Sequence, residues 1–299
     1  MDKNTNSTAT AVQAQEERRI TPAQKFRESR DLVLSQIKTL CNEGKLNLPT
    51  NYSAGNALMQ AQLMIQDDYK AMSCTKASIC SAFLTMCVTG LNPKKGQCYF
   101  IPYGQTLSLD ISYKGYAAIA KRIDPTISDI VSRVVTKDEE FDFEDLPNGY
   151  SRILKHKRSI ESMEIKDPNK DIVAAYATII YKNGEMRSLI MPYSEILKRW
   201  RMSQRHPVNQ DGTLKPDSTH AQFPDKMACR TVTKAICMPI VSESDDNDLF
   251  ISTVMSNTVE NARIESDAEA EEKMCEGDVV DIEPDYEDKV DVDTGEINN

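Results

Sequence analysis

The dipeptide Asn183-Gly184 constrains the fold of this chain more than any other short feature. It separates residues 172–182 (IVAAYATIIYK) from residues 185–191 (EMRSLIM), two runs rich in residues that favour strands. Asn-Gly forms the tight turn between antiparallel strands, because both residues tolerate positive φ. The sequence therefore predicts a β-hairpin here, and with it an antiparallel sheet.

Strand-like and helical segments flank this hairpin on both sides. The sequence predicts further strands at 97–101, 106–112, 127–136, 139–144 and 152–155. Apolar residues recur with the helical period at 22–43, 53–68, 75–89, 113–122, 193–202 and 224–237. No repeated strand–helix–strand pattern occurs. The predicted fold class is α+β, with antiparallel hairpins and small sheets packed with helices in a single core domain.

The charge of the chain is divided unevenly along its length. Residues 241–299 carry 20 acidic and 3 basic side chains, which leaves 33 basic and 26 acidic side chains in the first 240 residues. We predict a disordered segment at 1–21, a core at 22–240, and an acidic, mostly disordered tail at 241–299 with a short helix at 247–264. A basic body with an acidic tail indicates nucleic-acid binding, although a basic domain with a solubilising tail shows the same pattern.

Several enzyme classes are disfavoured by missing motifs. The chain has no GxxxxGK[ST] loop, no GxG pair, no HExxH and no GxSxG, which argues against P-loop ATPases, Rossmann enzymes, zinc proteases and serine hydrolases. Its eight cysteines form no CxxC pair, so we expect reduced thiols and no zinc site. No apolar run is long enough to span a membrane. We therefore expect a cytoplasmic protein that needs no cofactor or metal.

One cluster of carboxylates keeps an enzymatic alternative open. Carboxylates that converge can hold Mg²⁺, as nuclease sites do. The same residues alternate with two phenylalanines, which is typical of an ordinary strand with one solvated face. The carboxylates at issue are Asp138, Glu139, Glu140, Asp142 and Glu144.

Basic residues interleaved with aromatic residues form the candidate DNA-binding set. A single DNA strand offers phosphates, which require cations, and unstacked bases, which stack on flat rings. Three of the basic residues are spaced four apart and so share one helix face; we call Lys226, Arg230 and Lys234 the cationic ridge. The aromatic residues could instead be core residues, and some cations could be exposed helix ends. The candidates are Lys94, Lys95, Tyr99, Tyr103, Tyr113, Lys114, Lys121, Arg122, Lys198, Arg199, Lys226, Arg230 and Lys234.

The stretch LNPKKGQCYFIPYGQTLSLDISYKGYAAIAKR at 91–122 resembles the signature of the RecT family of phage single-strand annealing proteins. Further matches follow in the same order: EEFDFE at 139–144, the hairpin at 175–184, the helix at 193–199 and MACRTVTK at 227–234. The resemblance covers roughly residues 30–240. The departures are Lys114 in place of arginine, exchanged basic residues at Arg230 and Lys234, and a longer insert at 203–222.

This resemblance implies an α+β core that forms rings or helical filaments on DNA. The implied activity is the annealing of complementary strands in homologous recombination, without ATP and without a covalent chemical step. A metal-dependent nuclease using 138–144 and a structural protein that coats single strands are the alternatives. By motif position, Lys114, Lys121, Arg122, Arg230 and Lys234 would contact phosphates.

The resemblance also implies a set of partners and a compartment. The partners are single-stranded DNA, the annealed duplex, and further copies of the chain. The acidic tail leaves alternatives open: it occupies the basic groove when DNA is absent, or it serves solubility, or it binds a phage exonuclease or a host single-strand binding protein. The protein would act in the cytoplasm of a bacterial host.

Overall fold

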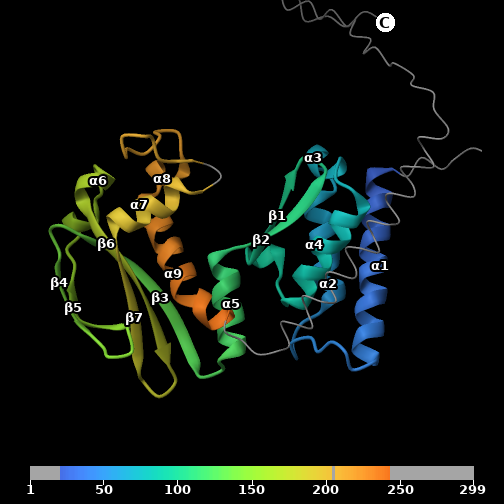
Figure 1. Ribbon diagram of the computed structural model, residues 1–299, viewed down its shortest axis with the longest axis horizontal. Coiled ribbons are helices and arrows are strands. Elements are labelled where there is room, and N and C mark those ends of the chain that lie inside the picture. Colours follow the sequence, from blue (N-terminus) through green and yellow to red (C-terminus); the bar gives the residue numbers. More distant parts are fainter. Residues whose placement is uncertain (1–20, 204–205, 243–299) are drawn as a thin grey trace, which may run out of the picture.

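The computed structural model describes residues 21–203 and 206–242 (Figure 1). The segment predicted to be disordered lies outside these residues except for Thr21, and the predicted helix at 247–264 lies wholly outside them. Within the described ranges, no helix combines the length and apolarity needed to cross a membrane.

The first half of the core is a helical lobe with one β-hairpin. Its helices are α1 (Pro22–Asn42), α2 (Ala54–Ile65), α3 (Tyr69–Met72) and α4 (Lys76–Val88). A short 3-10 helix, η1 (Pro93–Lys95), leads into strands β1 (Cys98–Tyr103) and β2 (Thr106–Ile111). Thr21, Ser53 and Thr75 cap α1, α2 and α4, because each side chain accepts a hydrogen bond from a free backbone N–H of the first turn. Phe26 and Phe83 are among the fully buried side chains of this lobe.

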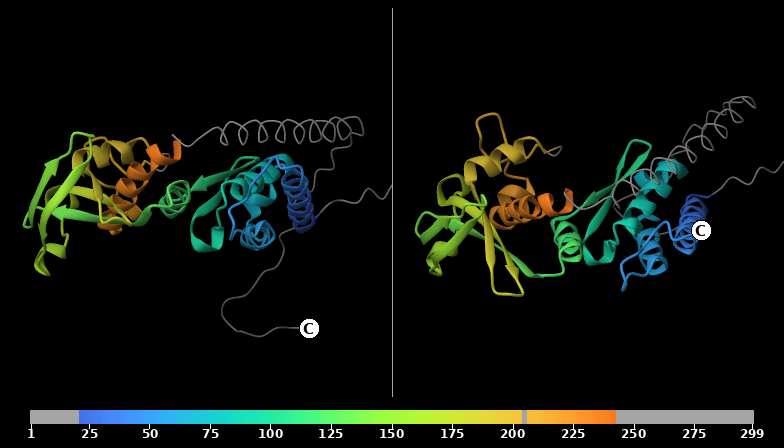
Figure 2. Two further views of the ribbon diagram at one scale, coloured as in Figure 1. Left: turned by 90° about the horizontal axis from the view of Figure 1, so that it is seen from below. Right: turned by 60° about the horizontal axis from the view of Figure 1, so that its bottom comes forward.

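The second half is a sheet lobe. Strands β3 (Ile127–Thr136), β4 (Glu140–Asp145), β5 (Ser151–Lys157), β6 (Ile172–Tyr181) and β7 (Met186–Pro192) form an antiparallel sheet in the order β3-β6-β7-β5-β4. Its other elements are η2 (Glu161–Met163), α6 (Pro168–Asp171), α7 (Tyr193–Arg201), α8 (Thr219–Gln222) and α9 (Pro224–Ser242). Helix α9 lies against one face of the sheet (Figures 1 and 2). Ala228, Val232 and Ile236 of α9 share a core with Ala175 and Ile179 of β6.

Helix α5 (Tyr113–Ile123) connects the two lobes and packs along α9 (Figure 1). Its first turn lies close to the helical lobe, because a Cβ at Gly115 would clash with the carbonyl oxygen of Gln97. Near its end, Arg122 donates hydrogen bonds to the carbonyl oxygens of Thr89 (2.6 Å) and Gly90 (2.8 Å). These carbonyls follow α4, so Arg122 satisfies acceptors that the helix end leaves open.

Helices packed with small antiparallel sheets confirm the predicted α+β class. Gly184 has φ 85° in the turn between β6 and β7, as the Asn-Gly hairpin requires. The short helices α3, α6 and α8 were not predicted. They are four residues each, too short for an apolar period, and form where Asp68, Asp167 and Ser218 cap a single turn.

Candidate nucleic-acid interface

The cationic ridge lies over aromatic rings along the junction of α5 and α9. Arg230 places its guanidinium carbon 5.6 Å from the ring centroid of Tyr113. The Nζ of Lys234 lies 4.9 Å from the ring centroid of Tyr116. Cations at such distances are attracted to the negative face of the ring. We call these four residues, together with Lys114 and Lys226, the α5–α9 seam.

Among the residues that the structure describes, the ridge cations have no acidic partner. Within residues 21–203 and 206–242, none of the three forms an ion pair, and Lys226 instead lies 4.9 Å from the ring of Phe223. Lys226 and Arg230 are exposed and Lys234 is half-buried. Four residues of helix rise about 6 Å, so the seam presents three positive charges at regular intervals along one line. Such a line of uncompensated charge attracts a polyanion.

Two further lysines lie close to the start of α5. Ser112, which caps α5, donates from Oγ to the carbonyl oxygen of Gly96 (2.6 Å) and from its backbone N–H to that of Gln97 (3.0 Å). These bonds hold η1, with the exposed Lys94 and Lys95, against the first turn of the helix. The lysines of η1 therefore extend the positive surface beyond the seam.

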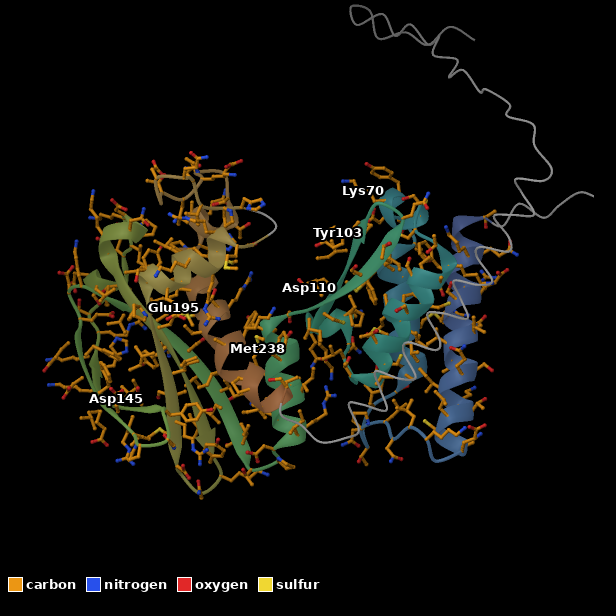
Figure 3. All side chains as sticks on the ribbon, in the orientation of Figure 1. Lys70, Tyr103, Asp110, Asp145, Glu195 and Met238 are labelled. Carbon is orange, nitrogen blue, oxygen red and sulfur yellow. The ribbon has the colours of Figure 1, made fainter. Side chains whose placement is uncertain are left out.

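Tyr99 and Tyr103 are exposed aromatic residues on the neighbouring hairpin. They are 48% and 49% exposed, and alternation along β1 places them on the face opposite Phe100, which packs edge-on against Phe83. In Figure 3, Tyr103 projects from the hairpin on the side of the sheet lobe. Both rings are thus available to stack on bases.

Three other candidates already have partners within the protein. Lys121 forms an ion pair with Asp129 at 2.8 Å, and Arg199 pairs with Glu195 at 3.0 Å on α7. The Arg122 guanidinium is committed to the end of α4, and burial lowers its pKa. A role in DNA contact stays a prediction for Lys121, Lys198 and Arg199. Trp200, on the same helix as Lys198 and Arg199, is buried and donates a hydrogen bond to Thr231. We do not include Arg122 in the proposed interface.

The carboxylates at 138–144 do not converge. The side chain of Glu139 is buried and accepts hydrogen bonds from Arg158 (3.1 Å) and from the Oγ of Ser162 (2.9 Å). Glu140 and Glu144 form ion pairs across the strands with lysine and arginine side chains of β5. In the part of the chain that the structure describes, no group of three or more His, Cys, Asp or Glu residues could hold a metal ion. The geometry therefore does not favour the nuclease alternative.

Two aromatic residues of the site were not singled out from the sequence. Tyr116 occurs in the YKGY motif but was not a candidate, and Phe223 precedes α9. Each lies beneath a ridge cation. An aromatic residue three positions after Tyr113 shares its helix face, so the spacing alone could have identified Tyr116. No comparable spacing signal marks Phe223.

Two comparisons with known proteins bear on this site. A search of curated proteins found no match. The RecT family model matches residues 55–273, which include all but the first residue of α2, the hairpin, the seam and the whole sheet lobe. The match covers most of the chain and both helices of the seam, and so this protein belongs to the RecT family, whose members bind single-stranded DNA and anneal strands in recombination.

Proposed function

We propose that this protein binds single-stranded DNA along the α5–α9 seam and anneals it to its complement without a nucleotide cofactor. The observation that carries the proposal is the set of three regularly spaced cations on α9, each held over a ring and none paired with an acid of the described ranges 21–203 and 206–242. Membership of the RecT family supports the same activity.

The seam can promote annealing through electrostatics alone. Two complementary strands repel each other because both are polyanions, and cations bound to the phosphates of one strand reduce that repulsion. If the seam holds the backbone, the base edges of the bound strand remain free to test a second strand. Base pairing then supplies the driving free energy, so the protein performs no chemical step.

Residues near the seam would extend the contact. Lys94, Lys95 and Lys114 would bind phosphates next to the ridge, while the exposed rings of Tyr99 and Tyr103 would stack on bases. Protomers side by side would join their seams into one continuous track, in a ring or a helical filament. The C-terminal region would bind an exonuclease or a single-strand binding protein.

The test is the rate at which two complementary fluorescent oligonucleotides anneal without ATP. Arg230→Ala/Lys234→Ala should abolish most of the acceleration, because it removes two cations that face DNA. Lys166→Ala/Lys170→Ala is the matched control, since it removes the same charge from exposed residues of the sheet lobe that pair with nearby acids. Each phosphate contact that is lost should make the salt dependence of binding shallower by about 0.7.

Other results would support the alternatives. Tight binding with no acceleration of annealing would identify a protein that only coats single strands. Shortening of the strands that stops on addition of EDTA would identify a nuclease. Equal loss of annealing in the ridge variant and the control variant would show that total charge, rather than the seam, determines activity.

A further inference from the structure

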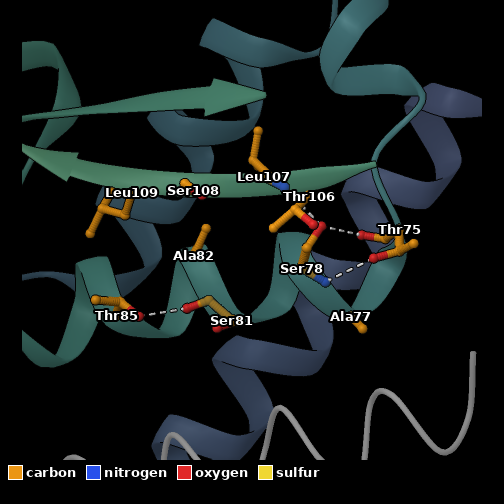
Figure 4. A pocket seen from close by; sticks show the side chains of 10 residues that line it. All are labelled: Thr75, Ala77, Ser78, Ser81, Ala82, Thr85, Thr106, Leu107, Ser108 and Leu109. Atoms are coloured by element: carbon orange, nitrogen blue, oxygen red, sulfur yellow. Dashed lines mark hydrogen bonds between the residues drawn. The ribbon is translucent and has the colours of Figure 1, made fainter. Parts of the chain in front are cut away.

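A groove of about 540 Å³ lies between α4 and β2, on the helical lobe and apart from the seam. Figure 4 shows β2 running beside α4, with side chains of both elements between them. Among the residues that line it, none is charged: they are Thr75, Ala77, Ser78, Ser81, Ala82, Thr85, Thr106, Leu107, Ser108 and Leu109. A surface of this kind offers no cation to a nucleic acid backbone and no opposite charge to a charged peptide.

Among the described residues, the edge of β2 that faces this groove is occupied at Gln105 and Leu107, where α4 begins, and has no hydrogen-bond partner at Leu109. The N–H of Leu107 points away from β1, because it donates to the Oγ of Ser78 at 3.0 Å. Leu107 lies opposite Pro102, which has no N–H. Along an antiparallel pair of strands, backbone groups that point toward the partner strand alternate with groups that point away from it. The N–H and C=O of Leu109, two residues after Leu107, therefore also point away from β1, toward the groove. An edge of this kind can pair with one more extended strand.

The chain contains a segment whose chemistry fits this edge. Residues 4–15 have no charged side chain, and residues 7–12 read Ser-Thr-Ala-Thr-Ala-Val. The β-branched Thr8, Thr10 and Val12 alternate with Ala9 and Ala11, as strand residues with one small face do. The small face suits the serine and alanine side chains of α4. Disorder predicted for this segment in isolation is compatible with a strand that forms on docking.

The segment can reach the groove from its own protomer. Lys25, in the first turn of α1, donates from Nζ to the carbonyl oxygen of Cys74 at 2.8 Å, just before α4 begins. Figure 1 shows the start of α1, α3 and the tip of the hairpin at the same end of the helical lobe. Eight residues lie between Gln13 and α1, and they span up to about 27 Å when extended. That distance exceeds the diameter of one helix, about 10–12 Å.

We propose that residues 7–12 pair with the edge of β2 at Leu109, beyond the part that Ser78 occupies, as an antiparallel third strand in the groove against α4. The direction follows from the reach, because the C-terminal end of the segment, which leads to α1, must lie at the Thr75 end of the groove, where β2 begins, so the segment runs opposite to β2. The proposal does not depend on the DNA-binding seam.

Residue-resolved hydrogen exchange on the full chain tests the docking. Thr10→Pro/Ala11→Pro removes backbone donors from both sides of the segment, so it prevents pairing in either register. Thr10→Ser/Ala11→Ser is the matched control, because it keeps every donor and the small side chains. We expect the Leu109 amide to exchange at least about tenfold faster in the proline variant than in the wild type or the serine variant. The Asp110 amide, which points toward β1, should exchange equally in all three proteins.

A second variant approaches the same contact from the groove. Ser81→Arg places a long charged side chain in the groove and should expose the Leu109 amide as the proline variant does. Thr39→Arg, on an exposed part of α1, controls for the added charge. Equal exchange at Leu109 in all these proteins would overturn the proposal. A change that extends equally to Asp110 would also overturn it, because it would reflect opening of the whole hairpin.

Discussion

Arg230 lies over the ring of Tyr113, with 5.6 Å between the guanidinium carbon and the ring centroid. The two residues belong to helices that are far apart in sequence, α5 in the middle of the core and α9 at its end, and Lys234 and Tyr116 repeat the arrangement one turn further along. The ring faces are therefore directed at cations. This geometry indicates that Tyr113 and Tyr116 position the ridge charges, whereas Tyr99 and Tyr103 remain open for stacking on bases.

Replacement of Tyr116 should separate these two roles. Tyr116→Leu removes the ring beneath Lys234 and should weaken binding of a single strand about two- to fivefold, since an exposed cation–π contact contributes about 0.5–1 kcal/mol. Tyr116→Phe keeps the ring and should bind as the wild type does. The salt dependence should be unchanged in both, because no charge is lost. Fluorescence anisotropy at several salt concentrations measures both quantities, and equal losses in the two variants would contradict the positioning role.

Gly115 should tolerate no side chain. A Cβ there would clash with the Gln97 carbonyl oxygen and lie 2.7 Å from Cγ2 of Ile111, so Gly115→Ala should destabilise the fold by about 1–3 kcal/mol. Gly55→Ala is the matched control, because it lies in helix α2 with open space around its Cβ. That substitution should stabilise the protein by up to about 1 kcal/mol. Urea unfolding of both variants checks the difference, and equal stabilities would contradict the close packing of α5.

The local features of this fold were predictable, and the long-range ones were not. The Asn183-Gly184 turn and the apolar periods of α1, α4 and α9 depend on neighbours in sequence, so their patterns identify them. The strand order β3-β6-β7-β5-β4 depends on contacts between distant segments. Alternation predicted two faces for β4, but only the structure shows that Phe141 stacks on Tyr176 at 5.5 Å.

In the candidate site, too, the local features were predictable and the long-range contacts were not. Spacing of four residues was sufficient to define the cationic ridge, because a helix determines which side chains share a face. The aromatic partners of Arg230 and Lys234 come from α5, and only the packing of α5 on α9 brings them together. Lys121 and Arg122 look equivalent as a basic pair, yet one is ion-paired at the surface and the other holds the end of α4.

Arg122 should therefore affect stability rather than DNA contact. Arg122→Ala removes two charge-assisted hydrogen bonds to the carbonyls of Thr89 and Gly90, and should cost about 2–3 kcal/mol. At a temperature where the variant is folded, its salt dependence of DNA binding should match that of the wild type. Lys114→Ala is the comparison. Because Lys114 is exposed, its replacement should make the salt dependence of DNA binding shallower with little loss of stability. A shallower salt dependence of DNA binding for Arg122→Ala would contradict this and would identify Arg122 as a phosphate contact.

Glu139 should make the free energy of unfolding depend on pH in the acid range. Burial raises the pKa of Glu139, but hydrogen bonds from His156, Thr136, Ser162 and Arg158 outweigh burial and leave the pKa below its ordinary value. Folding therefore favours the carboxylate. This contribution is complete above the ordinary glutamate pKa of about 4.3 and is lost as the pH falls through the lower pKa of the folded state.

The substitution Glu139→Gln should flatten this dependence. The variant should be less stable than the wild type at pH 7, because Arg158 loses its charged partner. The difference between the two proteins should shrink as the pH falls below about 4. Unfolding in urea at several pH values measures it, with the exposed Glu164→Gln as control. A difference that stays constant down to acid pH would show that the proton on Glu139 is not coupled to folding.

The acidic tail should compete with DNA for the ridge. Residues 241–299 carry a large excess of negative charge, and they are tethered to the helix that carries the ridge cations. Deletion of residues 243–299 should therefore raise the affinity for single strands. The gain should be largest at low salt, where charges interact over about 30 Å, and small at 1 M salt, where they interact over about 3 Å. Replacement of the tail acids by Asn and Gln keeps the length of the tail and should give the same gain. Unchanged affinity at low salt in both variants would show that the tail does not occupy the ridge.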